Sequence, residues 1–140
     1  MKTNETKQQI LEAIAAAQDK KAEELAILEL DKEAVTDYFV ICSGTNPRQV
    51  EAIAEEIELR LKRTGLYPAH VEGYKQAEWI LLDYIDFVVH IFVEKARRYY
   101  DLERLWKSAT HLTPAELKAP TRRAAVKKRA AAGAPRRKRA

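Results

Sequence analysis

Two short apolar runs, residues 78–83 and 87–92, lie only three residues apart in this chain. Apolar runs of this length on either side of a turn predict two neighbouring antiparallel strands. Because side chains alternate between the two faces of a strand, the pairing register decides which residues enter the core. A β-branched residue such as Ile85 resists the positive φ of a tight two-residue turn, so we expect a four-residue loop at 83–86.

The hairpin should present two faces of different character. Loops of two and of four residues give the same faces, whereas a three-residue loop would exchange them. The uniformly apolar face that fits under helices then consists of Ile80, Leu82, Phe87, Val89 and Ile91, with Ile80 opposite Val89. The other face places Trp79 beside His90, Leu81 beside Val88 and Asp83 near Asp86. Either a further helix or a partner could cover it, and the two aspartates could simply form the turn.

Helical spacing of apolar residues predicts three helices. The first covers residues 5–18. The second follows Asn46 and Pro47, which suit the N-cap and the first helical position, and it stops at Gly65. The third buries a stripe and leaves Tyr100 on its outer side; the stripe is Tyr99, Leu102, Leu105, Trp106 and Ala109.

Runs rich in β-branched and aromatic residues predict three more strands, at 24–30, 37–42 and near 68–72, of which the first two should be adjacent and antiparallel. The order α-β-β-α-β-β-β-α predicts an α/β or α+β domain, with a mixed β-sheet of about five strands and helices packed on it. A length of 140 residues suits one such domain, which we place at residues 1–112.

The formal charge of +4 conceals two unlike parts. Residues 119–140 contain no acid and nine basic residues: Arg122, Arg123, Lys127, Lys128, Arg129, Arg136, Arg137, Lys138 and Arg139. Of the 25 basic residues, 16 remain against 21 acidic ones, so residues 1–118 have a net charge of −5. The prolines and the Ala/Arg/Lys composition of residues 113–140 predict a disordered basic tail, which either binds nucleic-acid phosphates or only improves solubility.

Little in the sequence indicates catalysis or a cofactor. Cys42 and Ser43 precede a helix, but the chain lacks G-x-S-x-G and a nearby histidine, which favours a buried strand cysteine. Residues 43–47 lack the lysine of a P-loop and suit helix capping. The histidines at 70, 90 and 111 show no spacing of metal ligands. A single cysteine and the lack of a signal peptide or membrane-length apolar run favour a cytoplasmic setting.

Five motifs occur together: TDYFVICSGT at 36–45, VEG at 71–73, WILLD at 79–83, VH at 89–90 and RYYDLERLW at 98–106. With these motifs the chain resembles the bacterial ribosomal silencing factors (RsfS, Iojap-like) from about residue 5 to residue 109. The resemblance implies a nucleotidyltransferase-like sheet without its catalysis. It also implies a translational repressor that binds the large ribosomal subunit through ribosomal protein L-fourteen, blocks subunit joining and lowers translation when nutrients are scarce.

The same resemblance implies the partner-binding residues, which are Glu72, Trp79, Leu81, Asp83, His90, Phe92 and Tyr100. Trp79 would be an aromatic anchor with Leu81 and Phe92 around it. Asp83 or Glu72 would pair with basic groups, since the ribosomal protein is basic. Family members usually carry glycine in the turn after Asp83, where this chain has Tyr84-Ile85, so we expect a reshaped hairpin tip.

Two other functions stay open at this point. A nucleotidyltransferase-type enzyme would need carboxylates spaced Asp-x-Asp to hold magnesium, and no such pair follows Gly44. A general RNA-binding module would depend on the basic tail, which we also expect to make non-specific contact with ribosomal RNA. We further expect that the free protein forms a homodimer through the Trp79 face.

Overall fold

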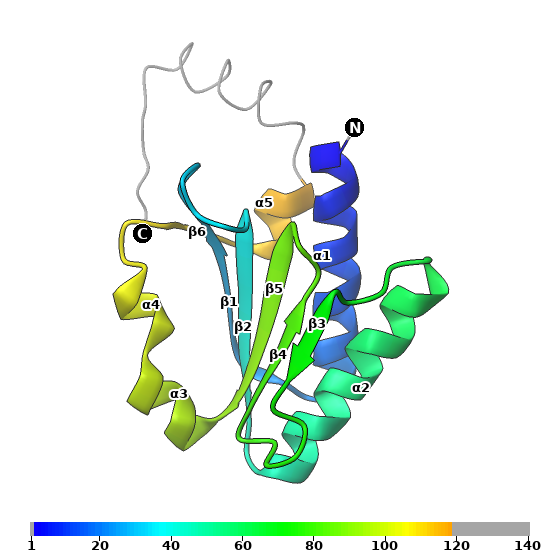
Figure 1. Ribbon diagram of the computed structural model, residues 1–140, viewed down its shortest axis with the longest axis vertical. Helices are drawn as coiled ribbons and strands as arrows, with labels where there is room; N and C mark the ends of the chain where they lie inside the picture. Colours follow the sequence, from blue (N-terminus) through cyan, green and yellow to red (C-terminus); the bar gives the residue numbers. More distant parts are fainter. Residues whose placement is uncertain (1, 119–140) are drawn as a thin grey trace.

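Figure 1 shows a mixed sheet with helices on both faces. The computed structural model describes residues 2–118, with side chains from residue 4 onward. The helices are α1 (Lys2–Asp19), α2 (Pro47–Arg63), α3 (Glu94–Tyr100), α4 (Leu102–Leu105) and α5 (Pro114–Lys118). The strands are β1 (Glu23–Glu29), β2 (Tyr38–Gly44), β3 (His70–Glu72), β4 (Trp79–Asp83), β5 (Phe87–Val93) and β6 (Thr110–Leu112). The predicted mixed α+β class is confirmed.

The sheet has the order β3-β4-β5-β2-β1-β6. Its central pair, β2 and β5, is parallel, and every other neighbouring pair is antiparallel. The predicted antiparallel pairing of β1 with β2 is confirmed. The prediction of about five strands missed β6, because a strand of three residues offers no run of alternating apolar side chains. That the fold is nucleotidyltransferase-like stays a prediction.

Helix α2 has the limits that the sequence predicts. The side chain of Asn46 accepts a hydrogen bond from the Gln49 amide at 2.9 Å, Pro47 opens the helix, and Gly65 follows it with φ +90°. This is the expected N-cap and glycine stop. The apolar stripe that faces the sheet is fully buried and consists of Val50, Ile53, Ala54, Ile57 and Leu61.

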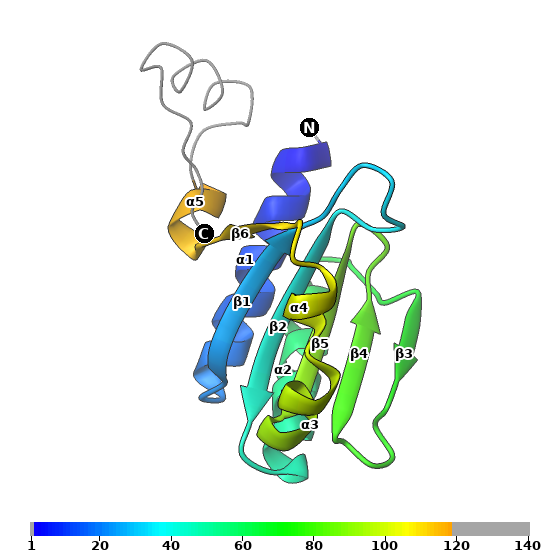
Figure 2. The ribbon, with the colours of Figure 1, turned by 90° about the vertical axis from the view of Figure 1, so that its left-hand side faces the viewer.

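Helices α1, α2 and α5 lie on one side of the sheet, and α3 and α4 lie on the other (Figures 1 and 2). The larger hydrophobic core lies under the first group and includes Leu117 of α5. Residues 114–118, which the sequence assigned to a disordered tail, are therefore helical and packed. Pro114 is the first residue of α5, a position that proline tolerates. The rest of the predicted tail, residues 119–140, lies outside the described residues.

The two faces predicted for the hairpin are confirmed, but the predicted register is wrong by two residues. Ile80 lies opposite Ile91 and Trp79 lies opposite Phe92, rather than opposite Val89 and His90. Because side chains alternate with a period of two, this shift moves the pairs without changing the face of any residue.

The predicted four-residue loop is also wrong, because the chain turns tightly at Ile85. The Tyr84 amide donates to the Phe87 carbonyl at 2.9 Å, and Ile85 adopts φ 74°, which β-branched residues resist. Three further hydrogen bonds hold the turn: Ile85 N to Asp83 Oδ1 at 2.8 Å, Thr36 Oγ1 to the Ile85 carbonyl at 2.8 Å, and Asp37 N to the Asp86 carbonyl at 3.1 Å. Two of these come from a segment almost fifty residues away in the sequence.

Replacing Ile85 with glycine should stabilise the protein. Glycine adopts positive φ without strain, and the Ile85 side chain is mostly exposed, so few contacts are lost. After allowing for the larger entropy of glycine in the unfolded chain, we expect the free energy of unfolding to rise by about 0.5–1 kcal/mol. Urea denaturation measures it, with Ile85→Ala, which retains Cβ, as the control. A glycine variant no more stable than the alanine variant contradicts this account.

The single helix predicted across residues 99–109 is wrong, since Asp101 adopts a left-handed conformation (φ 49°) and separates α3 from α4. A left-handed residue turns the following segment away from the first helix axis, so spacing across it no longer describes one face. Tyr99 and Leu105, which were predicted to be buried, are 81% and 72% exposed. Leu102 and Ala109 are buried as predicted.

Candidate partner-binding surface

Helices α3 and α4 cross one face of the sheet in front of its middle strands and leave β3 and β4 uncovered there (Figure 2). On this face His70 of β3 pairs with Asp83 of β4, and Glu72 pairs with Leu81. Tyr100 borders them from the end of α3. We call the following six residues, all half-buried or exposed, the open face: His70, Glu72, Trp79, Leu81, Asp83 and Tyr100.

The open face contains five of the seven predicted partner-binding residues: Glu72, Trp79, Leu81, Asp83 and Tyr100. The other two, His90 and Phe92, belong to the same side of the sheet but are only 4% and 1% exposed. Direct contact of these two with a partner does not fit such burial. They lie beneath Trp79 and support it from below.

Trp79 is held by aromatic rings on two sides. Its ring centroid lies 4.9 Å from that of Phe92, with the rings stacked, and 4.6 Å from that of Tyr100. Tyr100 in turn meets the exposed Tyr99 edge-on at 5.0 Å. Such contacts fix the orientation of a side chain that remains partly accessible. Trp79 is therefore a preorganised aromatic group, which loses little conformational freedom when a partner binds.

A hydrogen bond ties the same tryptophan to His90. The indole Nε1 of Trp79, which can only donate, lies 3.1 Å from Nδ1 of His90. Nδ1 must therefore accept, and the proton of the neutral ring is on Nε2. Burial lowers the pKa of His90 to about 3, so the ring stays neutral at physiological pH.

This burial predicts acid sensitivity. Below its ordinary pKa of about 6.5, His90 binds a proton in the unfolded chain but not in the folded one, so the folded state loses stability as the pH falls toward 3. Between pH 7 and pH 5 the free energy of unfolding of the wild type should therefore fall by about 2 kcal/mol more than that of the His90→Gln variant. Urea denaturation at both pH values measures the difference. Equal losses in the two proteins would show that His90 is not the titrating group.

The open face is acidic. Glu72 and Asp83 are its carboxylates, and none of its six residues is lysine or arginine. His70 Nε2 lies 2.7 Å from a Glu72 oxygen, and one oxygen of Asp83 accepts the Ile85 amide, so Asp83 forms the turn as well as facing outward. The sequence did not indicate His70, because the pairing of the short strand β3 could not be predicted from its residues.

Arg97 is the other residue that the sequence did not indicate, and it fastens α3 and α4 to the sheet. Its buried guanidinium donates to Ser43 Oγ at 2.9 Å, to a Glu103 oxygen at 2.6 Å and to the Glu24 carbonyl. Glu24 lies at a β-bulge of β1 with φ 53°, where the ladder with β2 is interrupted. Arg97 therefore joins β1, β2, α3 and α4 at one point.

The residues considered for nucleophilic chemistry have structural roles. Cys42 is fully buried, and burial raises the pKa of its thiol to about 12. Ser43 is equally buried and accepts from Arg97. Within residues 2–118, no group of three His, Cys, Asp or Glu side chains could hold a metal ion. No helix of this described part is both long and apolar enough to cross a membrane.

A family model described as "Ribosomal silencing factor during starvation" matches residues 3–139 of the chain. The chain belongs to this family. The match also includes the basic tail, which the sequence resemblance had left outside. The ribosomal silencing factor RsfS of Bacillus subtilis is 43% identical to it over 98 residues, which are 69% of this chain and 83% of that protein.

Two further comparisons concern the fold and a more distant relative. A crystal structure of a Chromobacterium violaceum protein has a TM-score of 0.69 at 33% identity, over 71% of this chain and 84% of that one. A mouse protein named mitochondrial assembly of ribosomal large subunit protein 1 is 29% identical over 98 residues, which are 66% of this chain and 42% of the mouse protein. The solved structure supports the fold, and the mouse relative is a protein named for assembly of the large ribosomal subunit.

Proposed function

We propose that this member of the ribosomal silencing factor family binds the large ribosomal subunit through its open face and thereby prevents joining of the small subunit. Ribosomal protein L-fourteen is the proposed contact, and lower translation under nutrient limitation is the proposed outcome. The observation that carries the proposal is the preorganised Trp79 beside two carboxylates on the uncovered β3–β4 edge of the sheet. The names of the bacterial and mouse relatives support the ribosome and its large subunit as the partner.

Each residue of the open face has a physical role in this proposal. Trp79 is the anchor that becomes fully buried, with Leu81 and Tyr100 as its apolar surround. Glu72 and the free oxygen of Asp83 attract lysine or arginine of a basic ribosomal protein. The mechanism is steric occlusion, which needs no catalytic group. A homodimer of the free chain and a cytoplasmic setting stay predictions.

A charge reversal at Glu72 of the open face tests the proposed surface. Glu72→Lys should weaken binding to isolated large subunits about three- to tenfold at low salt, because an exposed ion pair contributes up to about 1 kcal/mol and the new charge repels a basic partner. Glu51→Lys makes the same change on the exposed side of α2, on the opposite side of the sheet, and is the matched control. Co-sedimentation measures binding, and gradient profiles after small subunits are added measure joining. Equal loss in both variants would exclude the open face.

The same assay tests the tail, for which we propose non-specific contact with ribosomal RNA. Deleting residues 119–140 should weaken association and flatten its dependence on salt without abolishing it, because phosphate contacts release counterions whereas the protein contact remains. If the deletion leaves association unchanged at every salt concentration, the tail has no part in the proposed binding. Association that requires the tail at every salt concentration would instead favour a general RNA-binding module.

A further inference from the structure

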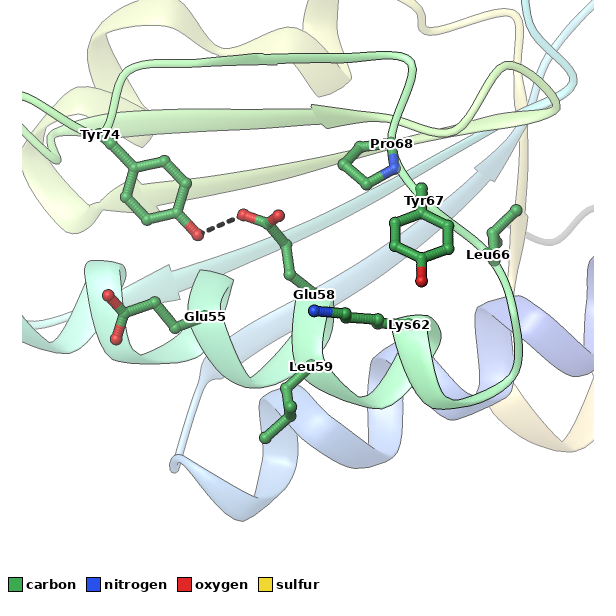
Figure 3. A pocket seen from close by; sticks show the side chains of 8 residues that line it. All are labelled: Glu55, Glu58, Leu59, Lys62, Leu66, Tyr67, Pro68 and Tyr74. Atoms are coloured by element: carbon green, nitrogen blue, oxygen red, sulfur yellow. Dashed lines mark hydrogen bonds between the residues drawn. The ribbon is translucent and has the colours of Figure 1, made fainter.

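A groove of about 400 Å³ lies on the side of the sheet opposite to the open face, between α2 and the segment that leads from α2 to β4 (Figure 3). Six of its lining residues are used below: Glu55, Glu58, Leu59 and Lys62 from α2, and Tyr67 and Tyr74 from the segment that follows. Tyr67 is 61% exposed although it is aromatic, and Leu59 is also exposed. The groove therefore combines accessible apolar surface with charged side chains.

One carboxylate of the groove is held in place. The Tyr74 hydroxyl donates to Glu58 at 2.6 Å, and both side chains point into the space between helix and segment (Figure 3). Burial and this hydrogen bond raise the pKa of Tyr74. Glu55 lies one helical turn before Glu58 on the same wall. Two carboxylates beside a tyrosine face and a leucine suit a cation on an aliphatic stem, which means arginine or lysine.

A buried hydroxyl in the larger core, on the same side of the sheet, also lacks a partner among the described residues. Tyr84 is 4% exposed, and its hydroxyl has no hydrogen bond to any described residue. Burial raises the pKa of Tyr84, and the charge of Glu58 raises it further. Buried polar groups in proteins are normally satisfied.

We propose that the groove is the intramolecular binding site of the chain's own arginine- and lysine-rich segment, residues 119–140. That segment has nine basic residues and no acid, against a net charge of −5 for the rest of the chain. It follows Lys118 of α5, which lies with α1 and α2 on the groove side of the sheet (Figure 1). Twenty-two residues can extend about 70 Å, and attachment to the same chain makes the local concentration high.

The contact between the groove and the basic segment is weak enough to be displaced by a competing polyanion. Lys62 opposes the two carboxylates, so these three side chains have a net charge of −1. Exposed ion pairs are screened by salt, and a polyanion competes for the same cations. Ribosomal RNA phosphates would therefore displace the segment from the groove. Only this last step rests on the proposed function, since the groove contact concerns the free protein.

A spin label on the segment tests the contact in the full chain. Ala132→Cys accepts the label selectively, because Cys42 is fully buried. At low salt, backbone amide signals around Glu55, Leu59 and Tyr67 should be broadened, and high salt should restore them. Glu55→Gln combined with Glu58→Gln should reduce the relaxation enhancement at Tyr67 about threefold or more, whereas Lys62→Gln should increase it. Glu51→Gln removes one carboxylate from α2 outside the groove and should leave the enhancement unchanged.

Three results would overturn the proposal. The first is broadening that is absent or uniform over the protein. The second is broadening centred on Trp79 and Leu81, which would place the segment on the open face. The third comes from a mixture of two kinds of chain, of which one carries the spin label and the other is isotope-enriched but has no spin label. Broadening of signals from the second kind would mean that the contact forms between two copies of the chain. Because none of these measurements includes a ribosome, the groove contact can fail without any consequence for large-subunit binding, and the reverse also holds.

Discussion

Trp79→Ala should lower the affinity for large ribosomal subunits about thirtyfold or more. An aromatic anchor that becomes fully buried typically contributes at least about 2 kcal/mol to binding, and a loss of 1.4 kcal/mol is a factor of ten. The substitution also removes the ring that links Phe92 with Tyr100 and the donor to His90 Nδ1. Small-subunit joining should then proceed in the presence of the variant. Co-sedimentation and gradient profiles measure both effects.

Loss of stability must be separated from loss of contact in this experiment. Trp106→Ala is the matched control. Like Trp79, Trp106 is a partly buried tryptophan that packs against the smaller hydrophobic cluster around Phe92 and Leu102, but it lies outside the open face, with its ring 5.5 Å from Phe39. We expect both alanine variants to be less stable by about 2–3 kcal/mol. Only the Trp79 variant should lose binding. Equal binding by wild type and Trp79→Ala would overturn the proposed surface.

Arg97→Met should have the largest effect on stability, with a decrease in the free energy of unfolding of about 3 kcal/mol. Methionine retains much of the aliphatic volume but leaves the Glu103 carboxylate, the buried Ser43 hydroxyl and the Glu24 carbonyl without their donor. Amide hydrogen exchange in α3 and α4 should become faster than in α2, since Arg97 joins these helices to the sheet. Ribosome binding should weaken as well, because Tyr100 of α3 supports Trp79.

The neighbouring Arg98 is the matched control for this prediction. It is exposed and belongs to the same helix, so Arg98→Met should change stability by no more than about 0.5 kcal/mol. Urea denaturation followed by circular dichroism measures both variants. A similar decrease in each would mean that helix propensity, rather than the buried hydrogen bonds, determines the outcome.

Part of the candidate surface was predictable from the residues alone. The period of two along β4 and β5 separates Trp79, Leu81 and Asp83 from the core face, and the structure confirms this division. The prediction that His90 and Phe92 contact a partner did not take account of α3 and α4, which cover that part of the sheet (Figure 2). Where the last helix breaks could not be read from spacing, since its apolar residues continue at helical intervals beyond Asp101.

The sequence by itself determined the features that depend on residues a few positions apart. These are the cap, the stripe and the end of α2, the two faces of the hairpin, and the separation of charge between residues 1–118 and 119–140. Only the tertiary structure decided the features that depend on distant partners. Thr36 holds the strained turn at Ile85 from 49 residues away, and Arg97 reaches Ser43 across 54 residues. The spacing of residues along the chain does not predict such contacts, because each forms only when the chain has already packed.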